Sequence, residues 1–81
     1  MIHELKTWPN YFQRVQQGVK TFEIRRNDRD FQVGDILNLT SYNPETKEQG
    51  PRKAYQVTYI LHGEQFGIER GYCVMAIIPY D

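Results

Sequence analysis

The sequence predicts a small α+β fold, a closed or nearly closed β-barrel of about five or six strands with an N-terminal helix packed against it. Three observations lead to this prediction. One early segment has apolar residues at helical spacing, several short segments have the composition of strands, and closely spaced turn signals separate them. A chain of 81 residues suits one domain, which we expect to span residues 1–81.

The first predicted elements are a strand at His3–Lys6 and a helix that begins at Pro9, since proline is favoured at the first helical position. Gly18 is a suitable C-terminal cap for this helix. Four apolar residues follow helical spacing, and we expect them to form its buried face: Trp8, Phe12, Val15 and Val19. The hydrophobic period then changes, which predicts a half-buried strand at Thr21–Arg26.

Three further strands are predicted from β-branched and aromatic residues between turn signals. The first is Ile36–Tyr42, and the polar stretch Asn43–Lys53 after it is expected to be a loop. Ala54–Leu61 is the clearest strand of the chain, because it is rich in tyrosine, valine, threonine and isoleucine. A loop with three glycines then leads to the last strand at Tyr72–Ile78, whose apolar composition predicts an interior position in the sheet.

Composition argues against several classes of protein. No apolar run approaches the roughly 20 residues that a membrane helix needs, and the first residues lack the apolar stretch of a signal peptide. Cys73 is the only cysteine, so we expect a buried thiol, no intrachain disulfide and a cytoplasmic location. One cysteine and two distant histidines make no structural metal site, and no cofactor is implied. A net charge of zero argues against strong nonspecific binding to DNA.

The main candidate site lies where the predicted helix gives way to the next strand. On that strand Glu23 and Arg25 point to the same face, roughly 7 Å apart along the chain, because side chains alternate with a period of two. We expect Phe22 and Ile24 to point the other way, into the core. Lys20 lies at the bend before the strand, so three charged groups of both signs gather at one end of a rigid element.

The chemistry of these three side chains suits a nucleotide or a modified nucleoside. Arginine offers a planar fork for a phosphate or a base edge, and lysine adds a second cation, or a nucleophile where it is desolvated. The carboxylate accepts hydrogen bonds from an exocyclic amine and holds both cations in place. The alternative is a ladder of ion pairs on a solvated face, which composition alone favours because such pairs are common and individually weak.

Four residues have the spacing G-x-K-x-x-E-x-R: Gly18, Lys20, Glu23 and Arg25. This motif resembles that of the activating-signal-cointegrator homology (ASCH) domains, which belong to the PUA-like superfamily of small β-barrels. Residues 3–9 and 67–75 resemble a narrower group of uncharacterised bacterial and phage proteins within it, so the resemblance covers essentially the whole chain. It implies a PUA-like barrel whose three charged motif residues line a cleft, between helix and barrel, that binds RNA or nucleotides.

Two other functions are compatible with the same residues. One ASCH-like branch hydrolyses the acetyl group of acetylcytidine, which would make Lys20 the nucleophile or base and Glu23 its proton partner, although that branch has threonine at the position of Glu23. The other is a protein-interaction module of phage or bacterial origin. His3 and Lys6 would border the cleft if the first strand neighbours the strand of the motif, but a histidine there is more often an ordinary, partly buried residue.

Overall fold

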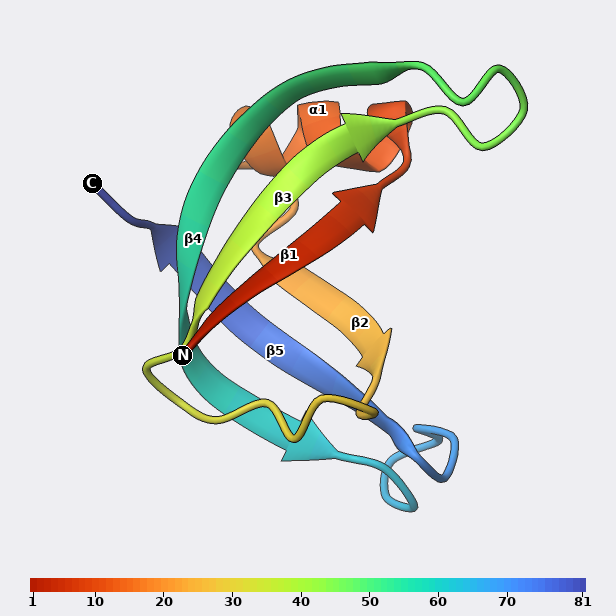
Figure 1. The fold of residues 1–81 in the computed structure, drawn as a ribbon. Coiled ribbons are helices and arrows are strands. Elements are labelled where there is room, and N and C mark those ends of the chain that lie inside the picture. The colour runs from red at the N-terminus through yellow and green to blue at the C-terminus, as the bar shows by residue number, and fades with distance from the viewer.

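The computed structural model describes residues 1–81 and consists of a five-stranded sheet that curls around one short helix (Figure 1). In chain order the elements are β1 (Ile2–Thr7), α1 (Pro9–Gln16), β2 (Phe22–Arg26), β3 (Ile36–Tyr42), β4 (Gln49–His62) and β5 (Tyr72–Pro79). The prediction of a small barrel-like α+β fold is confirmed. The helix is the second element of the chain and follows the first strand.

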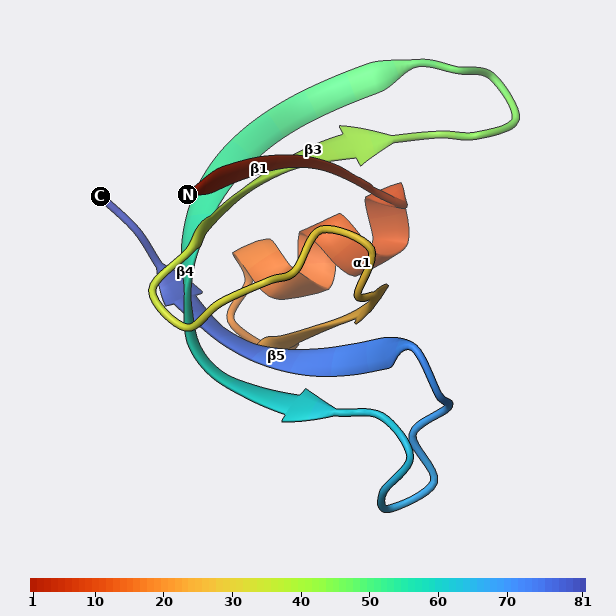
Figure 2. The ribbon, with the colours of Figure 1, turned by 60° about the horizontal axis from the view of Figure 1, so that its bottom comes forward.

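The strand order is β1-β3-β4-β5-β2, with β1 and β3 parallel and the other three pairs antiparallel. Register shifts interrupt the pairing of β4 with both of its neighbours, and such bulges increase local bending and twist. Because β4 is 14 residues long and strongly bent, it takes part in both halves of the curl (Figure 2). The edge strands β1 and β2 therefore approach each other without pairing, and we call the gap between them the seam.

The core fills the concave side of the sheet. One cluster of 11 buried residues unites the helix, four of the strands and the β2–β3 connection: Leu5, Val15, Phe31, Leu37, Leu39, Tyr55, Val57, Ile60, Cys73, Met75 and Ile77. The predicted burial of Cys73 is confirmed, and burial raises the pKa of its thiol. No helix of the structure has the length and apolar character that crossing a membrane requires.

The helix buries less of its predicted apolar face than the sequence suggests. Phe12 and Val15 are buried, whereas Trp8 and Val19 are exposed, so the prediction that all four pack inward is wrong. The helix has 8 residues, about two turns, and both exposed residues lie beyond its ends. Gly18 has a φ of +79°, the left-handed conformation that a glycine cap adopts, and it turns the chain away before Val19.

The strand predictions are confirmed to within one residue at every boundary except the start of β4. We expected a loop over residues 43–53, but β4 already begins at Gln49, so Gly50 and Pro51 lie inside a strand. The β3–β4 pairing is irregular at this point, between Thr40 and Tyr42. Proline is tolerated within a sheet at such a bulge, because no regular ladder hydrogen bond is needed from it. The last strand, β5, lies between β4 and β2, in the interior position that its composition predicts.

Candidate ligand-binding cleft

Strand β2 turns its charged face, not its apolar face, toward the inside of the curl. Glu23 is only 3% exposed, whereas Phe22 and Ile24 are 41% and 57% exposed. The predicted alternation is present, but the prediction that Phe22 and Ile24 enter the core is wrong. The inner face of this edge strand borders the seam, where cationic partners make burial of a carboxylate tolerable.

The buried carboxylate of Glu23 is held between two cations. Lys20 Nζ lies 2.6 Å from Oε2, and Arg25 Nη2 lies 2.9 Å from Oε1. The Arg25 Nε also donates to Oε1, at 3.2 Å. The side chains of Lys20 and Arg25 are 18% and 23% exposed, so each cation is mostly buried at its contact with Glu23 yet still reaches solvent. Lys20, Glu23 and Arg25, the charged trio, therefore meet as a single cluster.

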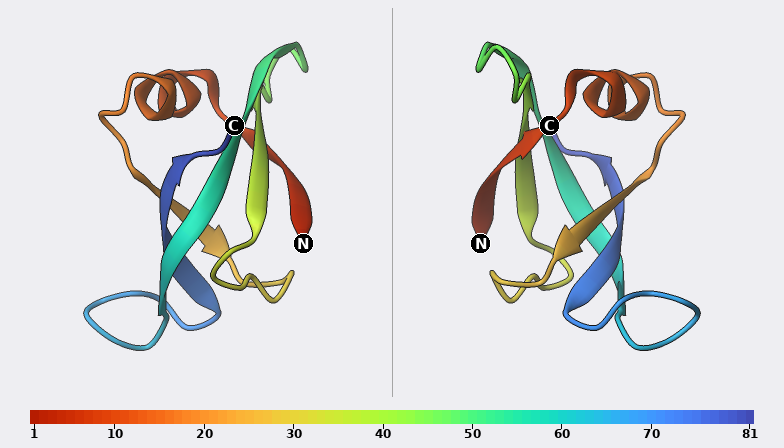
Figure 3. Two further views of the ribbon diagram at one scale, coloured as in Figure 1. Left: turned by 90° about the vertical axis from the view of Figure 1, so that its left-hand side faces the viewer. Right: turned by 90° about the vertical axis from the view of Figure 1, so that its right-hand side faces the viewer.

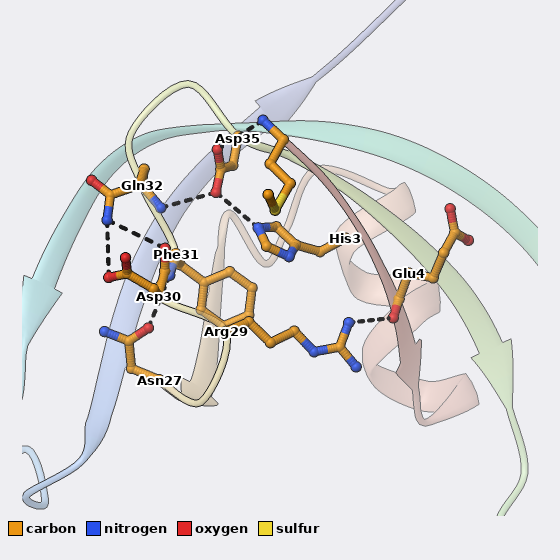
Figure 4. Close-up of polar contacts among 9 residues, drawn as sticks. His3, Glu4, Asn27, Arg29, Asp30, Phe31, Gln32 and Asp35 are labelled. Atoms are coloured by element: carbon orange, nitrogen blue, oxygen red, sulfur yellow. Dashed lines mark hydrogen bonds and ion pairs between the residues drawn. The ribbon is translucent and has the colours of Figure 1, made fainter.

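Arginine side chains also join the two sides of the seam. The Arg25 Nη2 donates to the main-chain oxygen of Lys6 and to Thr7 Oγ1, both at 3.0 Å. Farther along the seam, Arg29 Nη1 donates to the main-chain oxygen of Glu4 at 2.9 Å, as Figure 4 shows. The main-chain oxygens of Lys6 and Glu4 both belong to the edge strand β1, whose free edge pairs with no other strand. These side chains thus provide the hydrogen bonds that an adjacent strand would otherwise supply.

A cavity of about 720 Å³ opens above the charged trio, between α1 and the edges of β1 and β2. We call this cavity the cleft. Four basic residues border it against the one acid, Glu23: Lys6, Arg14, Lys20 and Arg25. The local charge is therefore positive although the chain as a whole is neutral. Walls of low dielectric strengthen the attraction of such a hollow for anions.

Aromatic rings form one wall of the cleft. Trp8 and Tyr11 lie on α1 or at its start and stack at a centroid distance of 5.9 Å and an interplanar angle of 19°. Phe22 contributes a third ring, whose centroid is 4.8 Å from Lys20 Nζ. The cleft thus combines cations with flat apolar surfaces, the two features that recognise the phosphate and the base of a nucleotide.

The structure separates the two residues of the first strand that the sequence nominated for the site. Lys6 lines the cleft, and its Nζ lies 4.4 Å from the ring centroid of Tyr42. His3 does not reach the cleft. It is buried elsewhere, with Nε2 2.8 Å from Asp35 Oδ2 and its ring edge against Phe31 (Figure 4). Position along β1 explains the difference, because Lys6 and Thr7 lie at the end of the strand that leads into α1, whereas His3 lies at its start, next to Asp35.

The chain matches the family model of a domain of unknown function, DUF3850, over residues 2–77. The chain belongs to the DUF3850 family. No curated protein sequence matches it. The matched range of the DUF3850 domain contains α1, strands β1 to β4, β5 as far as Ile77 and every residue of the cleft, so the cleft lies in the region that defines the family.

Seven residues that line the cleft of this DUF3850 domain are not among the predicted site residues, and three of them, Trp8, Tyr11 and Arg14, belong to the helical segment. Trp8 was assigned to the core, and neither Tyr11 nor Arg14 was singled out as a site residue. Their spacing could have indicated a shared surface, because positions 8, 11 and 14 recur every three residues and so lie on one side of a helix. That side faces the cleft, whereas Phe12 and Val15 face the core.

Tyr55 approaches the charged trio of the DUF3850 domain from the interior. Its hydroxyl is buried and has no hydrogen-bond partner in the protein. Burial raises the pKa of Tyr55, and the negative charge of Glu23 raises it further. Glu23 thus lies between the cationic cleft on one side and, on the other, the apolar core that contains the Tyr55 hydroxyl.

The pair of His3 and Asp35 serves the fold at the start of β1. Burial alone would raise the pKa of Asp35, but hydrogen bonds from His3, from the main-chain N–H of Gln32 and from the amino group of Met1 outweigh it. The pKa of Asp35 is therefore lower than its ordinary value of 3.8. This carboxylate pins the start of β1 to the turn that precedes β3.

Proposed function

We propose that the cleft binds RNA or a nucleotide, and that the protein is a PUA-like barrel of the ASCH kind. The observation that supports the ligand class most strongly is the presence of unused hydrogen-bond donors and aromatic rings in one hollow. The curled sheet, the position of the cleft beside the helix, and the register of the Lys20–Arg25 motif support the fold assignment.

The hydrogen-bond inventory of the cleft favours an anionic ligand rich in acceptors. Arg25 uses Nε and Nη2 within the protein, and its Nη1 has no partner there. The side chain of Arg14 makes no hydrogen bond to the protein either. Glu23 is buried, and its two oxygens are already engaged by Lys20 and Arg25. A phosphate, which offers several acceptor oxygens to a guanidinium fork, complements this set better than a neutral nucleoside.

The aromatic wall supplies the other half of a nucleotide site. Trp8 and Tyr11 are both exposed, and their stacked rings present a flat surface next to the cations. Stacking of a base on such a surface contributes about 1–3 kcal/mol. The cavity of about 720 Å³ lies within the size range of small-molecule sites. A mononucleotide, or one nucleotide of an RNA strand, fits this combination of size, charge and ring surface.

Trp8 provides a direct test, because it is the only tryptophan of the chain and lies in the cleft. We expect cytidine monophosphate and short single-stranded RNA to change its fluorescence in a saturable way, and cytidine to bind more weakly. Arg14→Ala and Arg25→Lys should each weaken binding at least about tenfold, as loss of a charge-assisted contact does. Arg70→Ala, at an exposed position outside the cleft, is the matched control. Absence of binding by calorimetry to any of these compounds would refute the proposal.

The contact of Lys20 with Glu23 favours hydrolysis of an acylated nucleoside as the second candidate. With Nζ 2.6 Å from Oε2, Lys20 can pass its proton to Glu23, and the neutral amine then takes a proton from water while the resulting hydroxide adds to the acyl carbon. The C–N bond then breaks, and the nucleoside amine leaves with the returned proton. Release of acetate from acetylcytidine, abolished in Lys20→Ala, is the expected result. Wild-type protein that leaves acetylcytidine intact contradicts this candidate.

We also infer that the protein works in the cytoplasm. The fold relies on an apolar core and ion pairs, and its one cysteine is a buried free thiol. Such a thiol suits a reducing compartment. Fractionation of the source cells, with detection by a specific antibody, tests the location.

A further inference from the structure

The convex face of β2, β5 and β4 is apolar across three neighbouring strands. On β5 the side chains of Cys73, Met75 and Ile77 point into the core, so the alternate residues point outward. Ala76 lies opposite Phe22 of β2 on one side and Tyr59 of β4 on the other. One residue pair farther along the strands, Val74 lies between Ile24 and Leu61 in the same way. These two rows form one continuous surface, which we call the apolar face.

Nothing in the protein covers the apolar face. Helix α1 packs on the concave side of the sheet, and Figure 3 shows it near one end of β2 and β5, with the loop of residues 63–71 at the other end. The exposed sheet surface of a monomer normally presents polar residues in alternation with the buried ones. In the two rows of the apolar face the outward residues are apolar instead, and Tyr59 remains 64% exposed.

The apolar face has the size of a stable interface. A large apolar side chain offers about 150–250 Å². Six such residues lie on this face or at its ends and are roughly half-exposed or more: Phe22, Ile24 and Tyr59 in the two rows, and Phe66, Ile78 and Tyr80 beyond them. Together they present roughly 600–700 Å² of apolar surface, at or above the largest patch of an ordinary monomer. A standard interface buries about 800 Å² on each partner, so the face and a narrow polar rim suffice for one.

The apolar face carries both a hollow and exposed rings that could fill one. A hollow of about 360 Å³ lies at its edge, between Ile24, Tyr72, Val74 and the loop that carries Phe66. Beside the hollow, Phe66 stands 87% exposed, and Tyr59 projects from β4. A ring from one copy can fill the hollow of another, and twofold symmetry would repeat this contact on both sides. Because the chain has zero net charge, two copies meet without long-range repulsion.

We propose that the protein forms a twofold-symmetric dimer through the apolar face, with β2, β5 and β4 of one copy against the same strands of the other. A second copy is the occupant that supplies both the hollow and the rings to fill it. The cations and the helix residues of the cleft lie outside the apolar face, whereas Phe22 and Ile24 border both.

Sedimentation velocity of the full chain, from micromolar to high micromolar concentration, tests this proposal. We expect the mass to rise with concentration from 9.7 kDa toward twice that value. Tyr59→Lys and Ile78→Lys should each raise the dimer dissociation constant at least about tenfold, because each places a charge in a desolvated contact. Val33→Lys, at an exposed apolar residue of the β2–β3 connection, is the matched control and should leave association unchanged.

Two results would overturn the proposal. One is a protein that stays monomeric at every concentration, including a monomer that captures a different protein instead. The other is a dimer that persists in the Tyr59→Lys, Ile78→Lys double variant, which would place the interface on another face. Circular dichroism establishes that each variant is folded. If a lysine variant unfolds, Tyr59→Thr and Ile78→Thr replace it, because threonine keeps the strand preference while removing the apolar surface.

Discussion

Arg25 holds one carboxylate oxygen of Glu23 with two nitrogens, Nε at 3.2 Å and Nη2 at 2.9 Å. The same Nη2 donates to the main-chain oxygen of Lys6 and to Thr7 Oγ1 on β1. One guanidinium therefore connects the interior carboxylate, the two sides of the seam and the floor of the cleft. A ligand that binds Arg25 contacts the group that also ties the edge strands together.

Removing the charge of Glu23 should destabilise the fold. Glu23→Gln keeps the size of the side chain but leaves Lys20 and Arg25 without their counter-charge. Breaking a fully buried ion pair costs about 3–5 kcal/mol, and the partial exposure of both cations reduces the expected loss to about 2–3 kcal/mol. Urea unfolding measures it. In the control Glu64→Gln, which affects an exposed pair with Arg70, the loss should stay below about 0.5 kcal/mol. Equal effects in the two variants would contradict this reasoning.

Shortening the reach of Arg25 should loosen the seam. The lysine of Arg25→Lys has no planar fork of donors, so it cannot donate to Glu23 and to two groups of β1 at once. Strand β1 therefore loses side-chain hydrogen bonds worth about 1–3 kcal/mol. We expect faster amide hydrogen exchange in β1, and mass spectrometry measures this exchange. Arg26→Lys is the control, because Arg26 points to the other face of β2 and contacts Tyr72. Unchanged exchange in β1 would show that the seam does not depend on Arg25.

Asp35 should make the fold sensitive to acid. Its pKa in the folded state is lower than the ordinary value of 3.8, so the unfolded chain binds the proton more readily. The stabilisation is therefore complete above the unfolded pKa and is lost as the pH falls through the folded pKa. In Asp35→Asn we expect a loss of about 1.5–3 kcal/mol at neutral pH and a shallower dependence of the urea midpoint on pH below about 4.

The control for this titration is Asp28→Asn, at an exposed position of the turn after β2. It should retain the acid dependence of the wild type. An Asp35→Asn protein whose urea midpoint follows the wild-type pH curve would mean that other carboxyl groups determine the acid sensitivity.

The buried hydroxyl of Tyr55 should be dispensable for stability. It has no hydrogen-bond partner in the protein, so Tyr55→Phe removes a desolvated polar atom and keeps the ring in the core. We expect the free energy of unfolding to stay within about 0.5 kcal/mol of the wild type, or to rise. Thermal and urea unfolding both measure it. A loss above about 1 kcal/mol would reveal a partner for the hydroxyl in solution.

The sequence determined the elements and the membership of the charged trio. Helical spacing, strand composition and glycine or proline turns are local signals, and they located all five strands and the helix, with one boundary misplaced at Gln49. Lys20, Glu23 and Arg25 lie within six residues of one another, so their convergence depends on little more than a bend and a two-residue repeat.

Only the tertiary structure decided which side of β2 is the inside. Alternation states that Glu23 and Phe22 point in opposite directions, but it does not say which direction is the interior. The curl of the sheet decides that, because it brings β1 and β2, the two ends of the strand order, together at the seam. The same long-range arrangement placed Lys6 in the cleft and His3 outside it, since contacts between distant strands depend on the path of the whole chain.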